Sequence, residues 1–242
     1  MLFTESQPVF FLKFQQYAGK YDEGKNMKIF AISDIHGEMR YFERAAGLIR
    51  SADMVAVAGD LEKTGSRESA EEVISCIENY NSNILAVHGN WDRKEVLDLL
   101  EERGYSIHGR GRIAGGIGFF GVGGSSVTPM NTVSEYTEEA INEFLTAGFN
   151  EIRHAEKIVL ISHTPPRKVR DRTFFGLRGG SASIAEFVKK STIALCIVGH
   201  IHEAFGTENL GNCIVVNTGP FKKGRYALID IGGSISVELG RL

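Results

Sequence analysis

The chain has 242 residues, which suits one α/β domain with a sizeable core and would crowd two full domains. Its formal net charge of −3 excludes a strong global attraction to nucleic acid or to an anionic membrane, although it leaves room for a local basic patch. The three cysteines are odd in number and stand at no metal-like spacing, so we expect no disulfide framework and a reducing, cytoplasmic location.

Residues 1–26 precede the first predicted strand. No stretch of the chain approaches the length of a membrane span. Lys13 interrupts the short apolar run at residues 9–12 and no cleavage-like site follows, so no signal peptide is predicted. We expect this extension either to pack as an extra helix or arm or to reflect an early start codon, and the main domain to cover residues 27–242.

Strands and helices alternate in the first half of the chain. The predicted strands are the apolar runs MKIFAIS, MVAVAG and ILAVH, and the predicted helices cover residues 38–50, 69–79 and 94–103. This βαβαβ order predicts a largely parallel sheet with covering helices.

The second half mixes turns, short strands and two further helical segments. Residues 110–124 are rich in glycine, which favours antiparallel strands with tight turns rather than a helix. A helix is predicted over residues 134–147. The later strands are the runs KIVLIS, ALCIVG, CIVVN, RYALID and SISVEL. The periodicity alone therefore indicates an α/β fold with some antiparallel strands, and we expect two sheets packed face to face.

Five short clusters of potential metal ligands each follow one of these apolar runs. They are Asp34-Ile35-His36, Gly59-Asp60, Gly89-Asn90, His163 and Gly199-His200-Ile201-His202. Residues just past the carboxyl ends of strands converge on one crevice of an open α/β sheet, so the clusters can share a site. Two carboxylates, four imidazoles and one amide oxygen exceed the needs of one closed zinc site and suit two adjacent ions. The sequence is therefore interpreted as a binuclear metallohydrolase.

Each of these residues also has an ordinary structural interpretation. Asp34 and Asp60 could be N-caps of the helices that follow, and His163 could be a hydrogen-bonded core histidine. All seven groups together argue against that interpretation, because charged groups and imidazoles rarely crowd one crevice without a partner ion.

The order D-x-H, G-D, G-N, H and G-H-x-H, from about Met27 to the C-terminus, resembles the calcineurin-like metallophosphoesterase superfamily. Because it has no inserted capping domain, the chain is most similar to the small prokaryotic members of this superfamily. The resemblance implies a four-layer αββα sandwich of two mixed β-sheets flanked by helices. It also implies two ion positions that share Asp60, with the ligand sets Asp34, His36, Asp60 and His202, and Asp60, Asn90, His163 and His200.

The same resemblance implies hydrolysis of phosphodiesters or activated phosphomonoesters by a metal-bound hydroxide, with Asp60, Asn90 and His200 as catalytic residues. Imidazole ligands favour transition metals over Mg²⁺ or Ca²⁺, so Mn²⁺ is expected first, with Fe or Zn²⁺ as alternatives. The expected partner is a small phosphate ester. No membrane partner and no strong nucleic-acid signal are expected, and a homo-oligomer is left open.

The chain departs from the family pattern after Asn90, where the family usually has a histidine and this sequence has Trp91. An indole does not donate a proton near neutral pH, so we expect poor cleavage of esters with poor leaving groups. Trp91 could form an aromatic wall for a base or aryl group, or fill a pocket at the start of the next helix. Asp92 is predicted to cap that helix, with Glu95 as its capping-box partner.

Residues 167–180 begin four residues beyond His163 and are predicted to border the site. Arginine suits bidentate phosphate contacts, whereas a solvated loop is the alternative. The candidate substrate-binding residues are Trp91, Arg167, Arg170, Arg172 and Arg178. Ser183 and Glu186 resemble a capping box, which would leave the N-terminus of the next helix approachable.

The remaining histidines are predicted to lie outside the site. His88 should point away from the crevice, because side chains alternate along a strand, and His108 and His154 should lie at the surface.

Two other functions remain open on the sequence. One is a phosphoesterase-like scaffold with little or no catalysis, which Trp91 and the N-terminal extension keep open. The other is a nuclease, which is less favoured because no DNA-binding domain or long basic surface is evident.

Overall fold

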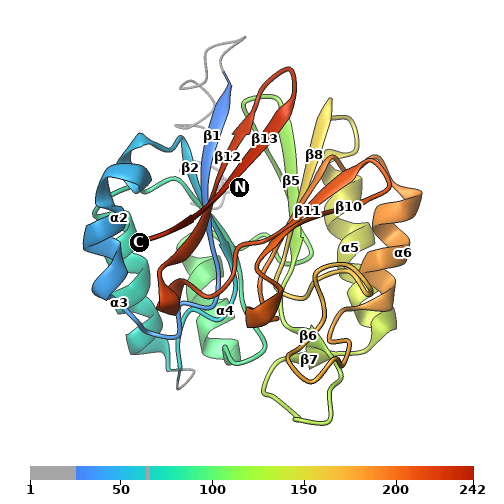
Figure 1. Ribbon diagram of the computed structural model, residues 1–242, viewed down its shortest axis with the longest axis horizontal. Helices are drawn as coiled ribbons and strands as arrows, with labels where there is room; N and C mark the ends of the chain where they lie inside the picture. The colour runs from blue at the N-terminus through green and yellow to red at the C-terminus, as the bar shows by residue number, and fades with distance from the viewer. Residues whose placement is uncertain (1–25, 64–65) are drawn as a thin grey trace, which may run out of the picture.

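Figure 1 shows the computed structural model, which describes residues 26–63 and 66–242 as two large β-sheets with helices on their outer sides. The expectation of an extra helix or arm before the first strand lies outside these residues, apart from Asn26. Among the helices in the described part of the chain, none is both long enough and apolar enough to cross a membrane.

The first sheet has five strands in the order β13-β12-β1-β2-β3. The strands β1 (Met27–Ile32), β2 (Met54–Ala58) and β3 (Ile84–Val87) are parallel to one another. The strands β12 (Arg225–Ile231) and β13 (Ile235–Arg241) complete the sheet in antiparallel pairing. Every residue of β2 and β3 is buried, as expected for strands that are covered on both faces.

The second sheet has six strands in the order β10-β11-β9-β8-β5-β4. Its parallel centre consists of β5 (Ile117–Val122), β8 (Lys157–Ser162), β9 (Leu195–Val198) and β11 (Cys213–Asn217). Its antiparallel edges are β4 (Gly111–Ala114) and β10 (Gly206–Leu210). Gly115 and Gly116 both have positive φ between β4 and β5, so the predicted glycine-rich antiparallel pair is confirmed.

Helices cover the outer faces of both sheets (Figure 1). The helices α2 (Arg40–Ser51), α3 (Arg67–Glu78) and α4 (Lys94–Glu102) share one apolar cluster with the first sheet. The helices α5 (Glu138–Ile152) and α6 (Ala182–Lys190) share another with the second sheet. A third cluster, which includes Leu85, Phe119 and Ile197, fills the space between the sheets. The expected four-layer αββα sandwich is therefore confirmed.

The helix predicted over residues 134–147 begins four residues later than expected. Glu135 and Tyr136 form the short strand β7 (Glu135–Tyr136), which pairs with β6 (Ser125–Ser126). Thr137 then caps α5, because its side chain accepts a hydrogen bond from the backbone of Ala140. The helical pattern was correct, and a local strand pairing decided where the helix begins.

Two predicted helix caps are wrong. Asp92 does not cap α4; the N-cap of that helix is Arg93, which makes no side-chain capping bond. The cap of α6 is Ser181 rather than Ser183, and Ser181 accepts from the backbone of Ile184. The local spacing favours caps at Asp92 and Ser183, whereas Asp92 binds the amides of Leu61, Glu62 and Gly89, and Ser183 binds Glu138.

Candidate metal centre

The five ligand clusters follow β1, β2, β3, β8 and β9, and the fold brings them to one place. Ligand atoms of Asp34, Asp60 and His163 lie within 4.8 Å of one another, and so do those of Asp34, His36 and His202. These two groups share Asp34. The carboxylate of Asp60 also lies between the two predicted ligand sets, since its Oδ2 atom is 3.6 Å from His36 Nε2 and 3.5 Å from His163 Nε2.

The first half of the centre is organised around Asp34. Its Oδ1 atom lies 3.1 Å from His202 Nε2, and its Oδ2 atom accepts from Ser33 Oγ at 2.6 Å and from the His200 backbone at 3.1 Å. His36 faces the same space, with its ring 5.6 Å from that of His202. The Nε2 atom of His36 is buried and has no hydrogen-bond partner within the described residues. A buried nitrogen of this kind calls for a missing partner.

The second half is organised around the side-chain oxygen of Asn90. Both His163 Nε2 and His200 Nδ1 lie 2.9 Å from Asn90 Oδ1. The other nitrogen of His163, Nδ1, donates to the carbonyl oxygen of Ala58 at 2.8 Å. That bond turns Nε2 of the same ring toward the site, which is the usual way a backbone carbonyl orients a ligating histidine.

The electrostatics of the centre favour a positive charge inside it. Burial raises the pKa of Asp60, whereas hydrogen bonds from His202 and Ser33 hold the pKa of Asp34 low in spite of burial. Burial lowers the pKa of His36 to about 4 and that of His200 to about 3, so both rings are neutral and able to ligate. The carboxylates of Asp60 and Asp34 raise the pKa of His163 in spite of burial, so the centre attracts positive charge.

Backbone strain concentrates at the same residues. Seven residues other than glycine have positive φ in the described chain, and four of them are Asp34, His36, Asp60 and His200. Side chains with a Cβ avoid this left-handed region, and such conformations persist where the surrounding structure enforces them, most often at functional sites.

The glycines of the motifs allow the loops to approach one another closely. A Cβ atom on Gly89 would lie 2.0 Å from Asp60 Oδ1, and one on Gly199 would lie 2.7 Å from Asp34 Oδ2. A Cβ on Gly59 would lie 2.6 Å from His163 Nδ1. The glycine in each motif therefore makes room for a ligand that belongs to another loop.

Several supporting residues were not predicted as part of the site. The buried carboxylate of Asp92 accepts from the backbone nitrogens of Leu61, Glu62 and Gly89, so it ties the loop after β2 to the loop after β3. The acid directly after Gly-Asn-Trp was a visible signal, but its spacing to Glu95 suggested a helix cap.

Asn217 supports the loop after β9 in a similar way. Its amide donates to the carbonyl oxygens of Gly199 and Ile201, both at 3.1 Å, and its side-chain oxygen accepts from Gly219. The sequence Asn-Thr-Gly-Pro indicated a turn and nothing more. Lys222 also lies near the centre: its backbone nitrogen donates to the backbone carbonyl oxygen of Asp34 at 3.3 Å. Burial lowers the pKa of Lys222, although Asp34 and Asp60 oppose that shift. No motif pointed to this lysine.

The arginines of the basic loop, residues 167–180, differ in their contacts. Arg170 donates to the carbonyl oxygens of Phe205 and Thr207, and Arg178 pairs with Asp171 at 2.5 Å. Arg167 and Arg172 are exposed. Substrate contacts by these four arginines stay predictions.

Three exposed aromatic side chains accompany the loop and the site. Phe174, Phe175 and Trp91 are 81%, 86% and 44% exposed. The backbone nitrogen of Trp91 donates to Asp60 Oδ1 at 3.0 Å, while its indole remains open to solvent. A contact between Trp91 and substrate also stays a prediction.

The N-terminus of α6 is not approachable in the way the sequence suggested. The carboxylate of Glu138, from the first turn of α5, accepts from Ser181 Oγ and from the backbone nitrogens of Ala182 and Ser183. An anion already occupies this helix end, so it offers no free amides to a phosphate.

The three remaining histidines lie outside the candidate ligand groups. His88 is buried and contacts the hydroxyl of Tyr136 at 3.0 Å, whereas His154 is exposed as predicted. The prediction for His108 is wrong: its ring packs against Tyr136 and Phe144, and burial lowers its pKa to about 4.

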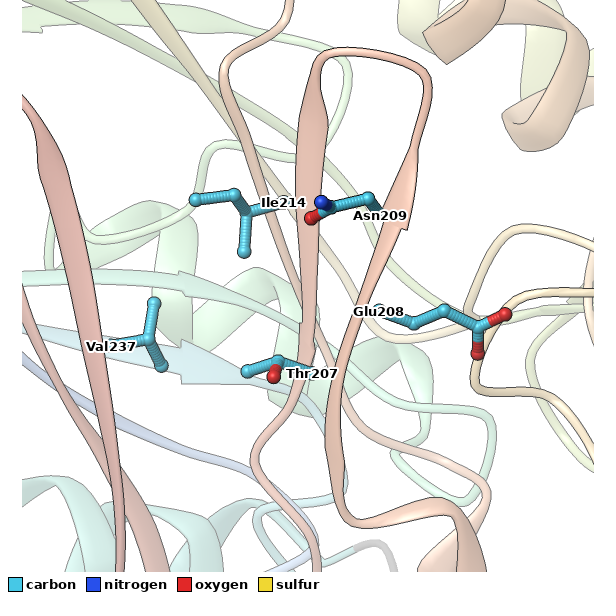
Figure 2. Close-up of a pocket in the computed structure, with 5 residues that line it drawn as sticks. All are labelled: Thr207, Glu208, Asn209, Ile214 and Val237. Atoms are coloured by element: carbon cyan, nitrogen blue, oxygen red, sulfur yellow. The ribbon is translucent and has the colours of Figure 1, made fainter.

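A separate groove of about 370 Å³ lies between the β10–β11 hairpin and β13. Figure 2 shows Ile214 and Val237 on its two sides, with the carboxylate of Glu208 pointing away from them. Glu208 pairs with Arg170 at 3.6 Å. The groove contains none of the candidate ligands, so it is distinct from the metal centre.

Comparisons with known proteins agree with this geometry. Residues 27–232 match the family model of the calcineurin-like phosphoesterase superfamily domain. An uncharacterized protein of Methanocaldococcus jannaschii is 34% identical over 224 residues, which cover 86% of this chain and 99% of that protein.

Solved structures share the fold at lower identity. A protein of Thermus thermophilus has a TM-score of 0.68 at 20% identity, with 89% of this chain and 99% of that one covered. A dimetal phosphatase of Danio rerio has a TM-score of 0.58 at 11% identity, with 88% and 98% covered. Because the family model and the Methanocaldococcus relative both span most of its length, the chain belongs to the calcineurin-like phosphoesterase superfamily.

Proposed function

We propose that the chain is a binuclear metal-dependent phosphoesterase that hydrolyses phosphodiesters or activated phosphomonoesters. The observation that carries this proposal is the convergence of Asp34, Asp60 and His163 with the other candidate ligands in one strained, buried centre. Family membership supports the reaction class.

The residues present fit two divalent ions. The unpartnered Nε2 atom of His36, the two neutral imidazoles and the buried carboxylates together form a donor set that needs cations. The proposed ligands are Asp34, His36, Asp60 and His202 for one ion, and Asp60, Asn90, His163 and His200 for the other. Ions held there would lower the pKa of a water molecule and offset the negative charge of the phosphoryl oxygens.

The protein's own groups restrict the substrate class. Position 91 offers an exposed indole instead of an imidazole, so the chain has no proton donor at this position for a poor leaving group. The same ring can stack on an aryl group or a base, and Arg167 and Arg172 are exposed for phosphate contacts. These features favour small esters with good or aromatic leaving groups.

The metal and the compartment are further parts of the proposal. Imidazole-rich ligand sets with carboxylates suit Mn²⁺, with Fe or Zn²⁺ as alternatives. Cys76, Cys196 and Cys213 are all free thiols, which supports a reducing cytoplasm.

Hydrolysis assays with metal-free protein test this function. We expect an aryl phosphodiester and an aryl phosphomonoester to be cleaved only after Mn²⁺, Fe²⁺ or Zn²⁺ is restored. Asn90→Ala should abolish most of this activity, whereas Asn150→Ala, at an exposed position of α5, should leave it unchanged. Full activity in the presence of a chelator would refute the proposal, and two bound ions without any hydrolysis would favour the scaffold alternative.

A further inference from the structure

The carboxylate of Glu135, the first residue of β7, accepts four hydrogen bonds from the loop between β6 and β7. Glu135 accepts from the backbone nitrogen and hydroxyl of Thr128 at 2.9 and 2.7 Å, and from those of Thr132 at 2.7 and 2.6 Å. Burial alone would raise the pKa of Glu135, but these bonds lower it to about 2. Glu135 is therefore ionised, and an ionised carboxylate can only accept.

This carboxylate sets the direction of the next hydrogen bond. A threonine hydroxyl has one proton, and Thr132 gives it to Glu135. Toward Asn90 the same oxygen can then only accept, and it lies 3.0 Å from Asn90 Nδ2. The NH₂ end of the Asn90 amide is thus held on the side of the loop.

The opposite end of the amide faces the candidate metal centre. With Nδ2 held by Thr132, Oδ1 points to His163 Nε2 and His200 Nδ1, each at 2.9 Å. Without the Thr132 hydroxyl, the Asn90 amide could turn by half a turn and present its NH₂ group to the two imidazoles. An NH₂ group at that position would repel a cation. The direction of the Glu135–Thr132–Asn90 chain therefore decides whether residue 90 offers an oxygen or a nitrogen.

The backbone of the loop reinforces the same contact. The nitrogen of Ser134 donates to the Asn90 carbonyl oxygen at 3.1 Å, and its hydroxyl donates to the Asp92 carbonyl oxygen at 2.6 Å. The loop thus holds the chain on both sides of Trp91, so the position of Thr132 relative to Asn90 is fixed from two directions.

We propose that Thr132 and Glu135 are positioning residues that force Asn90 to present its side-chain oxygen to one of the two ions. This rests on the proposed function and deepens it, because it assigns a role to a loop outside the ligand motifs.

A Mn²⁺ titration of the metal-free protein tests this positioning role without an activity assay. Binding is monitored by calorimetry and by the electron paramagnetic resonance signal of free Mn²⁺. Thr132→Val should lower the affinity for one of the two ions by roughly 10- to 100-fold and leave the affinity for the other nearly unchanged. This is the usual effect of removing a group that orients a metal ligand. Thr132→Ser keeps the hydroxyl and should bind both ions like the wild type. Thr207→Val, the same substitution at an exposed site on β10, should also have no effect.

Glu135→Gln supplies a second route if Thr132→Val does not fold. The glutamine can donate a hydrogen bond to Thr132, so the hydroxyl proton of Thr132 is free to turn toward Asn90. This change should also lower the affinity for one ion. In the Thr132→Val background this second change should add little, because both act through the same bond.

Three outcomes separate the possibilities. Wild-type affinity for both ions in the folded Thr132→Val and Glu135→Gln variants would overturn the positioning role alone. Loss of both ions together with a lower unfolding temperature would also overturn it, since that pattern indicates a structural role. A wild-type protein that binds fewer than two ions would overturn the proposed function itself, and this inference with it.

Discussion

Gly89 gives the most direct test of packing at a single residue. A Cβ atom there would meet Asp60 Oδ1 at 2.0 Å and the Asp60 backbone nitrogen at 2.2 Å, so the loop after β2 would have to move. We expect Gly89→Ala to lower the free energy of unfolding by about 1–3 kcal/mol, as overpacking does, and to displace a candidate ligand. Urea denaturation and Mn²⁺ titration of the same sample would measure both effects.

Gly47 supplies the matched control for this substitution. It lies inside α2, and an added Cβ would meet nothing within 4 Å. Gly47→Ala should therefore raise the free energy of unfolding by roughly 0.5–1 kcal/mol, because alanine is the better helix former. Equal stability and equal metal binding in the two variants would show that the close approach at Gly89 does not matter.

Trp91 is proposed to set how the proposed reaction depends on the leaving group. Because the indole does not donate a proton near neutral pH, we expect nitrophenyl esters to be cleaved far faster than alkyl esters. Trp91→His should selectively increase the rate of hydrolysis of alkyl esters, since a positioned acid typically raises the reaction rate by about 10²- to 10⁴-fold. The backbone bond from residue 91 to Asp60 does not depend on the side chain, so it should persist in the variant.

Trp91→Phe controls for the loss of the indole, because it keeps an aromatic ring without adding an acid. Rates over a series of leaving groups would be compared for the three proteins after their fold and metal content are checked. An unchanged slope in a folded, metal-loaded Trp91→His protein would assign Trp91 to packing or stacking.

Among the elements, α5 and α6 are joined through Glu138. Hydrogen bonds from Ser181, Ser183 and Ala182 lower the pKa of this carboxylate although burial opposes the shift. The unfolded chain therefore takes up the proton first, so the stability from Glu138 is complete above pH 4.5 and is lost as pH falls below that value. Glu138→Gln should lower the free energy of unfolding by about 1–2 kcal/mol at neutral pH, as the loss of a helix cap does.

Glu139→Gln is the control for this prediction, since Glu139 is exposed in the same first turn of α5. It should change the free energy of unfolding by less than about 0.5 kcal/mol. Denaturation at pH 7 and pH 3.5 would compare the three proteins. If the difference in unfolding free energy between Glu138→Gln and wild type were the same at both pH values, the Glu138 carboxylate would not be what stabilises the N-terminus of α6.

The elements themselves could largely be predicted because their signals are local. The apolar runs before Asp34, Asp60 and Asn90 identified the strands, and the parallel order of those strands implied that their ends meet. The roles of Asp92 and Glu138 could not be predicted, because both carboxylates bind amides more than 25 residues away. Long-range contacts of this kind leave no periodic pattern in the sequence.

At the scale of the whole molecule, the candidate centre joins the two sheets. Asp34, Asp60 and Asn90 follow strands of the first sheet, whereas His163 and His200 follow strands of the second. The order of the candidate ligands along the chain could be predicted from motifs, but the contacts of Thr132 and Asn217 with the surrounding loops could not. Their contacts exist only after the sheets and their loops have assembled.

Because the centre spans both sheets, metal binding should stabilise the entire fold. At a free Mn²⁺ concentration 100 times the Kd of a site, the free energy of unfolding should rise by roughly 2.7 kcal/mol. Calcium at the same concentration serves as the control, because it prefers oxygen ligands and should stabilise far less. Equal denaturation midpoints with Mn²⁺ and with a chelator would show that the ions do not link the two sheets.

The central claim is that two ions bind and share Asp60. Its carboxylate approaches His36 at 3.6 Å and His163 at 3.5 Å, which belong to the two different ligand sets. The most direct measurement is the metal content and Mn²⁺ affinity of the wild type and of Asp60→Asn. The predicted result is two ions per chain in the wild type and weakened binding of both in the variant, with activity abolished. A single ion in the wild type, or two tightly bound ions in a folded Asp60→Asn protein with near-normal turnover, would contradict the claim.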